Sequence, residues 1–271
     1  MAKKDNPTRE EPLTLESLKK LGALDKYFSP PEGPFAPTGA WENTYSLWLV
    51  QAGESGGGAL RIKRTPAPNG KEVELDVTQD IRQSTGSLFR TKAKVRCAAD
   101  ALATPLSWEL ESAVYDTGNK IIAETTLSQS AKVEDGKIKV TDNGKALTRE
   151  APRLYTSNWS LFDAIQRLPN TDKPAPEFSL LEDLDLRKDG QRITAIGAGQ
   201  IEAGGKTIRV HGFQHVGRAI LPYRYWLDGQ NRLLVAISGI RAYLYAPAAF
   251  QRLAQLAARK GKGKVKSNEN E

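Results

Sequence analysis

Apolar and polar residues alternate along most of this chain in short runs separated by turn-forming residues. The clearest case lies between Gly205 and Ala246, where two apolar runs flank Asp228-Gly229-Gln230-Asn231 and a third follows Ser238-Gly239. Val, Ile, Tyr and Trp dominate these runs and favour strands, whereas Gly, Asn and Asp favour tight turns. This stretch therefore predicts an antiparallel meander of strand, turn, strand, turn and strand.

The same rhythm covers the region that begins at Trp41. Further strands are predicted at residues 41–50, 59–64, 73–77, 88–98, 106–115, 120–129, 137–142, 178–187 and 192–201. Pairs such as Asp135-Gly136 and Asn143-Gly144 are strong tight-turn signals between neighbouring runs. A regular strand spacing of about ten residues predicts one continuous antiparallel sheet.

Three stretches have helical spacing instead. Thr14 is a suitable N-cap for an amphipathic helix over residues 15–27, where leucine recurs every third position. A second helix is predicted from Trp159 to Leu168, ended by Pro169, and we expect it to plug or cover the sheet. A third is predicted over residues 248–259, which have one apolar face.

These elements predict a mainly β protein, with a large curved antiparallel sheet or open half-barrel, one internal helix and short terminal helices. We expect residues 1–40 to contain a disordered N-terminus, a short helix and a Pro-rich linker. Residues 41–246 are predicted to form a single β domain, and residues 247–271 a C-terminal helix and a basic disordered tail. A parallel α/β fold is not expected, because helices do not alternate with strands.

The composition suits a folded domain, since the chain has 271 residues of which 39% are hydrophobic. No apolar run reaches the roughly 18 residues that a membrane-spanning helix needs. The first residues, MAKKDNPTREE, lack the apolar core of a signal peptide. We therefore expect a periplasmic or secreted protein if a signal peptide was removed, and a cytoplasmic one otherwise.

The net charge of +7 is unevenly spread along the chain. Residues 259–271 carry five basic and two acidic side chains, a net charge of +3. Such a tail can bind a polyanion, such as nucleic acid or anionic lipid. We favour the simpler interpretation that it is a solvated tail.

Cysteine and histidine offer little catalytic chemistry. Cys97 is the single cysteine, so no internal disulfide can form, and we interpret it as a small buried hydrophobe. His211 and His215 are four positions apart on a predicted strand, which separates them by about 13 Å. One metal cannot bind both at that distance unless Gly212 forms a bulge, so we predict no metal site and expect hydrogen-bonding roles on the sheet. We also predict no cofactor.

Two carboxylate pairs leave a hydrolase open as an alternative. Glu109 and Glu111 are two positions apart on a predicted strand, as are Asp183 and Asp185, so each pair shares one face. Carboxylates facing each other across a cleft can hydrolyse glycosidic bonds. A solvated strand face explains both pairs equally well, and we assign no catalytic residue.

The final meander also carries a resemblance. Tyr225-Trp226-Leu227-Asp228, followed by Arg232-Leu233-Leu234-Val235, resembles the last hairpin of periplasmic half-barrel proteins of the LolA/LolB lipoprotein-carrier type and of uncharacterised envelope proteins of similar architecture. In that family a curved sheet wraps a helix, and its concave face holds acyl chains. The resemblance covers residues 156–245 and transfers no functional residue. The N-terminal extension and the basic tail depart from the family.

The leading hypothesis is a non-enzymatic bacterial envelope protein that binds an apolar ligand, a lipid or a lipidated partner on the concave face. Aromatic side chains dominate apolar pockets, so the predicted contacts are Trp48, Trp108, Trp159, Phe162 and Tyr225. The alternatives are a glycan-directed hydrolase that uses carboxylates on the concave face, and a scaffold domain whose tail binds polyanions. The sequence predicts no oligomeric state.

Overall fold

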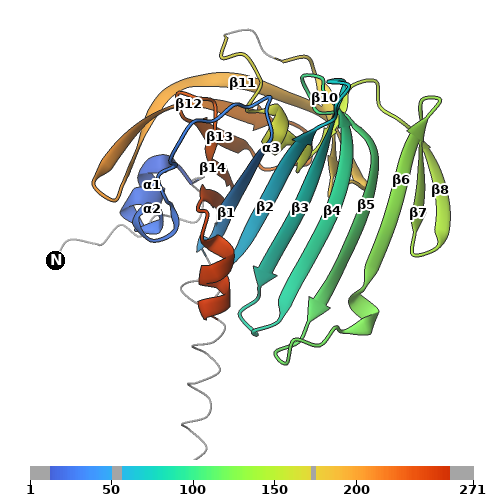
Figure 1. The fold of residues 1–271 in the computed structure, drawn as a ribbon, viewed down its shortest axis with the longest axis horizontal. Coiled ribbons are helices and arrows are strands. Elements are labelled where there is room, and N and C mark those ends of the chain that lie inside the picture. Colours follow the sequence, from blue (N-terminus) through green and yellow to red (C-terminus); the bar gives the residue numbers. More distant parts are fainter. Residues whose placement is uncertain (1–12, 51–56, 172–174, 257–271) are drawn as a thin grey trace, which may run out of the picture.

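All fifteen strands belong to one curved sheet in the computed structural model, which describes residues 13–50, 57–171 and 175–256. The sheet bends around one short internal helix (Figure 1). The predicted mainly β class, with a curved and largely antiparallel sheet, is therefore confirmed. No helix in the described ranges is long and apolar enough to cross a membrane.

The first half of the sheet is a meander that runs from the middle of the sheet to one edge. Its strands are β1 (Trp41–Leu49), β2 (Gly57–Pro66), β3 (Glu72–Arg82), β4 (Leu88–Ala98), β5 (Pro105–Tyr115), β6 (Leu127–Glu134), β7 (Lys137–Asp142) and β8 (Lys145–Glu150). Each pairs antiparallel with the next.

The second half runs from the opposite edge back to the middle. Its strands are β9 (Tyr155–Ser157), β10 (Phe178–Glu182), β11 (Leu186–Ala203), β12 (Lys206–Val216), β13 (Tyr223–Leu227), β14 (Leu233–Ser238) and β15 (Arg241–Tyr245). β9 and β10 are parallel, and the remaining neighbours are antiparallel. β15 then pairs with β1, with Tyr45 opposite Tyr245, so the first and last strands meet in the middle. The antiparallel meander predicted over residues 205–246 is confirmed, but it has four strands instead of the predicted three, because the first predicted run is divided into β12 and β13.

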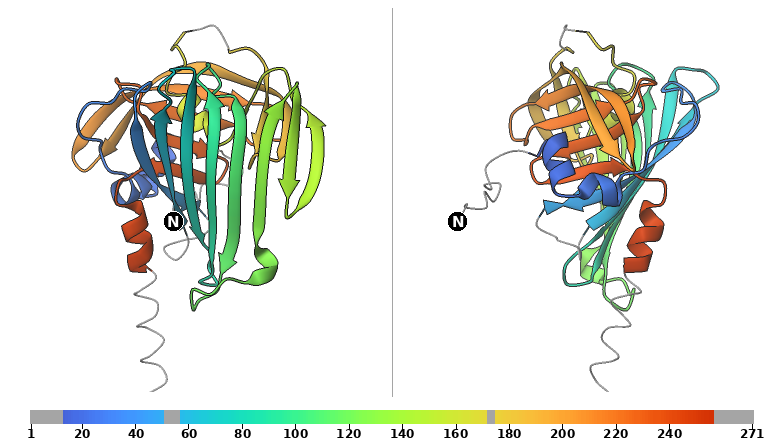
Figure 2. Two further views of the ribbon diagram at one scale, coloured as in Figure 1. Left: turned by 45° about the vertical axis from the view of Figure 1, so that its right-hand side comes forward. Right: turned by 90° about the vertical axis from the view of Figure 1, so that its left-hand side faces the viewer.

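Strand alternation separates a concave inner face from an outer one. On β3, Val73, Leu75 and Val77 are buried on the inner face, while the acidic residues between them lie on the outer face. Outer-face Glu74 pairs with Lys94 of β4. The two halves of the sheet face each other (Figure 2), and their buried apolar side chains form one core cluster between them.

The terminal helices cover the outer face. The predicted helix over residues 15–27 is two helices, α1 (Leu15–Lys20) and α2 (Ala23–Tyr27), because Gly22 adopts a left-handed φ of 69° between them. Leu15 packs near Gly199 of β11. At the other end of the chain a helix, described over residues 249–256, packs on the outer face of β2 and β4 through Ala249 and Leu253.

Several predicted boundaries are wrong. The strand predicted over residues 120–129 is a turn followed by the short 3-10 helix η2 (Ala123–Thr125), and β6 begins only at Leu127. β8, at the edge, was not predicted. The single strand predicted over residues 178–187 is divided by a tight turn, where Asp183 and Leu184 have φ of 50° and 63°.

Candidate functional site

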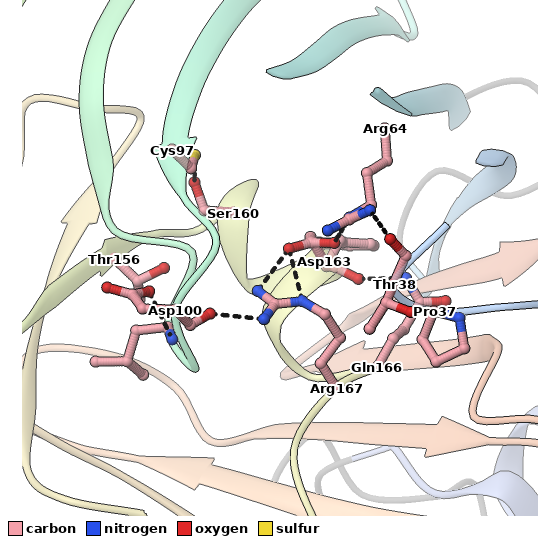
Figure 3. Close-up of polar contacts among 12 residues, drawn as sticks. Pro37, Thr38, Arg64, Cys97, Asp100, Thr156, Ser160, Asp163, Gln166 and Arg167 are labelled. Atoms are coloured by element: carbon pink, nitrogen blue, oxygen red, sulfur yellow. Dashed lines mark hydrogen bonds and ion pairs between the residues drawn. The ribbon is translucent and has the colours of Figure 1, made fainter. Parts of the chain in front are cut away.

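A buried ion network fixes the internal helix α3 (Ser160–Ala164) inside the sheet (Figure 3). The Asp163 carboxylate accepts a 2.7 Å hydrogen bond from Arg64 Nε of β2 and another of 2.7 Å from Arg167. Arg64 also donates to the Gly39 carbonyl, and Arg167 donates to the Asp100 carbonyl. Asp163 is fully buried, so both guanidinium groups are needed to compensate its desolvation.

Gln166 adds neutral hydrogen bonds to the same anchor. Its Oε1 accepts hydrogen bonds from Asn43 of β1 and from the backbone N–H of Leu233 of β14, at 3.2 and 2.9 Å. Its Nε2 donates to the Phe162 carbonyl at 2.7 Å. The helix is therefore attached to both halves of the sheet, and the surfaces around it are held in fixed positions.

An aromatic cluster packs beneath α3. The Phe162 ring makes edge contacts with Tyr45, Tyr243 and Tyr225, with centroid distances of 5.3, 5.4 and 6.5 Å. All four side chains are buried. The protein's own side chains therefore fill the space between α3 and the inner face of β1, β13 and β15.

A cavity of about 220 Å³ lies beside this cluster, between α3 and the inner face of β3 to β6. Its buried floor contains Trp159, Leu110, Tyr243, Gln79 and Thr91. Its less buried walls and mouth are formed by Ile81, Phe89, Ser112, Leu127, Asn158, Glu182, Asp183, Tyr223 and Arg241. We call this the interior cavity. Aromatic and aliphatic side chains line part of it, and half of its lining residues are polar or charged. A ligand would therefore meet apolar surface together with groups that can fix its orientation.

The mouth of the interior cavity is charged. Glu182 forms an ion pair with Lys188 at 2.6 Å. Asp183 exchanges two hydrogen bonds with Asn158, one from Asn158 Nδ2 and one to Asn158 Oδ1 from the Asp183 backbone N–H. Partial burial at the mouth raises the pKa of Asp183. Arg241 lies beside the hydroxyl groups of Tyr223 and Tyr243.

Both tyrosines of the cavity are protonated donors near neutral pH. Burial raises the pKa of Tyr223 to about 12. Burial also raises the pKa of Tyr243, whereas the neighbouring Arg241 opposes this shift. Gln79 Nε2 lies 3.5 Å from the Tyr243 hydroxyl oxygen, deeper in the same cavity. A ligand here would therefore meet hydroxyl and amide groups as well as apolar surface.

The structure brings some of the predicted contact residues together and separates others. Trp159 lines the interior cavity, whereas Phe162 and Tyr225 are buried in the aromatic cluster behind it. Trp108 lies on the inner face of β5 but not in the cavity wall, and its Nε1 donates to Gln129 at 2.7 Å. Trp48 is three positions from the inward-facing Tyr45, so it lies on the outer face, and its predicted place on the concave face is wrong.

The carboxylate pairs do not meet across the concavity. Glu109 and Glu111 lie opposite Lys94 and Lys92 in the β4–β5 register, on the outer face, because they alternate with the inward-facing Leu110. Their predicted concave placement is wrong. Asp183 lies at the cavity mouth, while Asp185 forms an exposed ion pair with Arg149.

The histidines and the cysteine are placed for packing. His215 is buried, with Nε2 3.0 Å from Gln191 Oε1, and burial lowers its pKa to about 4. Cys97 is buried as predicted, and burial raises the pKa of its thiol to about 12. Among the described residues, no three His, Cys, Asp or Glu side chains are grouped closely enough to hold a metal ion.

An apolar groove of about 430 Å³ lies elsewhere, lined by Leu102, Leu154, Leu168, Ile193 and Phe213, among others. Its wall also includes Thr171 and Ala175, which adjoin residues 172–174 outside the described ranges. The whole basic tail, residues 259–271, also lies outside the described residues, so the predicted polyanion site has no structural account.

The alternation of the final meander contained a signal for the missed cavity residues. Arg241, Tyr243 and Tyr245 occupy every second position of β15, so they share the inner face. Tyr223 and Tyr225 do the same on β13. Assigning alternate residues of these two strands to opposite faces would have placed Arg241, Tyr223 and Tyr243 on the inner face of the sheet. No sequence pattern indicates that Gln79 and Thr91 lie opposite them.

Comparison with known proteins identifies the architecture alone. No protein-family model matches the chain, and no curated protein matches it. The chain is similar in structure to a beta-barrel-like protein of the domain of unknown function DUF1849 from Brucella abortus, with a TM-score of 0.50 and 11% sequence identity. The match covers 77% of this chain and 96% of that one. The chain therefore has a β-barrel-like fold that it shares with a protein of unknown function.

Proposed function

We propose that this protein binds an apolar ligand, such as the acyl chain of a lipid or of a lipidated partner, in the interior cavity. The observation that carries the proposal is a cavity beside the anchored helix α3, in whose buried floor Trp159, Leu110 and Tyr243 provide apolar and aromatic surface next to the polar Gln79 and Thr91. Burying apolar ligand surface contributes about 0.8 kcal/mol for each CH₂ group. The proposed role is binding rather than catalysis.

The size of the cavity restricts the ligand. Its volume of about 220 Å³ equals about seven water molecules at ~30 Å³ each. That is below the roughly 300–1,000 Å³ of pockets that enclose drug-sized ligands. The cavity therefore suits a short chain, or the end of a longer one that leaves through the mouth.

We also propose that this binding takes place in the bacterial cell envelope. The support is the resemblance to half-barrel lipoprotein carriers together with the curved sheet around α3. Lipids and lipidated proteins, the ligands named above, are concentrated there.

The test uses octan-1-ol, an uncharged eight-carbon probe, and isothermal titration calorimetry. Ser112 is half-buried in the cavity wall, so Ser112→Phe should fill the cavity and weaken octan-1-ol binding at least about tenfold. Glu111→Phe places the same side chain on the outer face of the same strand and should leave binding unchanged. If wild type does not bind octan-1-ol, or if both variants bind it equally well, the proposal is wrong.

A further inference from the structure

We propose that the ligand of the interior cavity carries a carboxylate, and that Arg241 binds it at the cavity mouth. This inference rests on the proposed function and adds the chemical class of the ligand, an amphipathic carboxylate with a short apolar chain.

Arg241 is placed to receive an anion. It is the first residue of β15, opposite Ser238 of β14 and Leu49 of β1, on the inner face. Among the described residues that line the cavity, it is the single basic one. No carboxylate of the described residues lies within 4.0 Å of its guanidinium nitrogens. Within the described part of the chain the guanidinium group thus has tyrosine hydroxyls beside it but no carboxylate partner, a position that a ligand carboxylate could take.

The two neighbouring carboxylates have other partners. Glu182 forms an ion pair with Lys188, and Asp183 is hydrogen-bonded to Asn158. A guanidinium offers two parallel N–H groups that match the two oxygens of a carboxylate. The Tyr223 and Tyr243 hydroxyls beside Arg241 can donate further hydrogen bonds to the same group.

The cavity separates the two ends of such a ligand. Trp159 and Leu110 lie in the buried interior, while Arg241 lies at the solvent-exposed mouth. An acyl chain directed inward would keep its carboxylate near water and near the guanidinium. This arrangement avoids the large cost of burying an unpaired charge.

The negative charge of Asp183 should weaken the binding of a ligand carboxylate, which allows a second test. Its carboxylate lies at the same mouth and repels a bound carboxylate. Asp183→Asn removes that charge and keeps an oxygen that can accept the hydrogen bond from Asn158. This variant should bind octanoate more tightly than wild type does. Asp185→Asn, two positions further along the chain at a residue paired with Arg149, should have no effect.

The experiment compares octanoate with octan-1-ol, which have chains of the same length and differ in the head group. Arg241→Gln should weaken octanoate binding about ten- to a hundredfold, the range for a hydrogen-bonded charge. It should leave octan-1-ol binding within about twofold. Arg224→Gln is the matched control, because it removes the same charge from the outer face of β13. Arg241→Lys keeps the charge, loses the paired N–H groups and should show an intermediate loss.

The outcomes separate the two proposals. One outcome is that Ser112→Phe weakens octan-1-ol binding while Arg241→Gln and Arg241→Lys leave octanoate affinity unchanged. This outcome overturns the carboxylate inference, whereas the proposed function stands. If neither probe binds wild type, both fail. A loss of octanoate binding in Arg224→Gln as large as in Arg241→Gln would also overturn the assignment, since it would show a general charge effect.

Discussion

His215 shows how one buried side chain makes the stability of this protein depend on pH. It is fully buried on the inner face of β12, hydrogen-bonded to Gln191. Its ring lies between Phe178 and Tyr223, with centroid distances of 5.5 and 6.1 Å. Burial lowers the pKa of His215 to about 4, whereas an unfolded histidine titrates near pH 6.5.

We predict that the free energy of unfolding decreases as the pH falls from about 6.5 to about 4. In that range the unfolded chain binds a proton at His215 and the folded protein does not, so protonation favours unfolding. The stabilisation from the neutral form of His215 is fully present above about pH 6.5. The difference between the unfolded and folded pKa values corresponds to about 3 kcal/mol of unfolding free energy. Urea denaturation of wild type and His215→Gln at pH 7 and pH 4.5 measures the difference.

In His215→Gln the free energy of unfolding should depend much less on pH. His211→Gln is the comparison, because His211 is only partly buried and should change the slope less. Equal pH slopes in wild type and His215→Gln would contradict the prediction.

At the scale of elements, glycine lets β11 and β12 approach the Trp226 side chain of β13. Gly199 and Gly212 both lie under the Trp226 ring on the outer face, and Leu15 of α1 packs over the same place. A Cβ atom at Gly212 would lie 2.7 Å from Trp226 Cζ3 and 2.9 Å from Ile196 Cγ1. The close packing of this ring therefore requires a residue without a side chain.

Gly212→Ala should destabilise the protein by about 1–3 kcal/mol, because an added methyl group overpacks this contact. The midpoint of urea unfolding, followed by tryptophan fluorescence, measures the effect. Gly229→Ala is the matched control, since no atom lies within 4 Å of an added Cβ there, and it should change stability by less than about 0.5 kcal/mol. Equal midpoints for the two variants would contradict the packing argument.

At the scale of the whole molecule, two meanders close around α3 and are joined at the β1–β15 pair. The Asp163 network connects parts of the chain that are far apart in sequence: the carbonyl of Thr38, Arg64 of β2, the carbonyl of Asp100 and Arg167 after α3 (Figure 3). This network thus holds α3 in place, and with it the wall of the interior cavity that α3 forms.

Asp163→Ala should destabilise the protein by about 3–5 kcal/mol, because two buried guanidinium groups lose their carboxylate. Glu111→Ala, which removes an exposed carboxylate from the outer face, should cost less than about 0.5 kcal/mol. Chemical denaturation of both variants at pH 7 measures the difference. A decrease in the free energy of unfolding of less than about 1 kcal/mol for Asp163→Ala would show that the network does not hold α3 in place.

Much of the architecture followed from local pattern. Alternation in β3 and β4 places one buried and one solvated face on each strand, and turn residues separate neighbouring strands there and in the final meander. In the final meander the apolar runs themselves predicted the strands, since β14 is buried on both faces. The short helix with its aromatic residues was recognisable from Trp159 and Pro169. The edge strand β8 was not, because its side chains are mostly exposed and carry no alternation.

The candidate site depended on tertiary contacts that no local pattern encodes. Gln79 and Tyr243 lie 164 positions apart in sequence and meet only because the sheet curves around α3. Trp48 was predicted on the wrong face because its aromatic character does not specify a face of the strand. The face depends on the position in the strand, since neighbouring residues point to opposite faces. The sequence by itself determined strands, turns and the alternating faces, since these depend on neighbouring residues. The curvature of the sheet, the buried anchor of α3 and the cavity were decided by long-range packing alone.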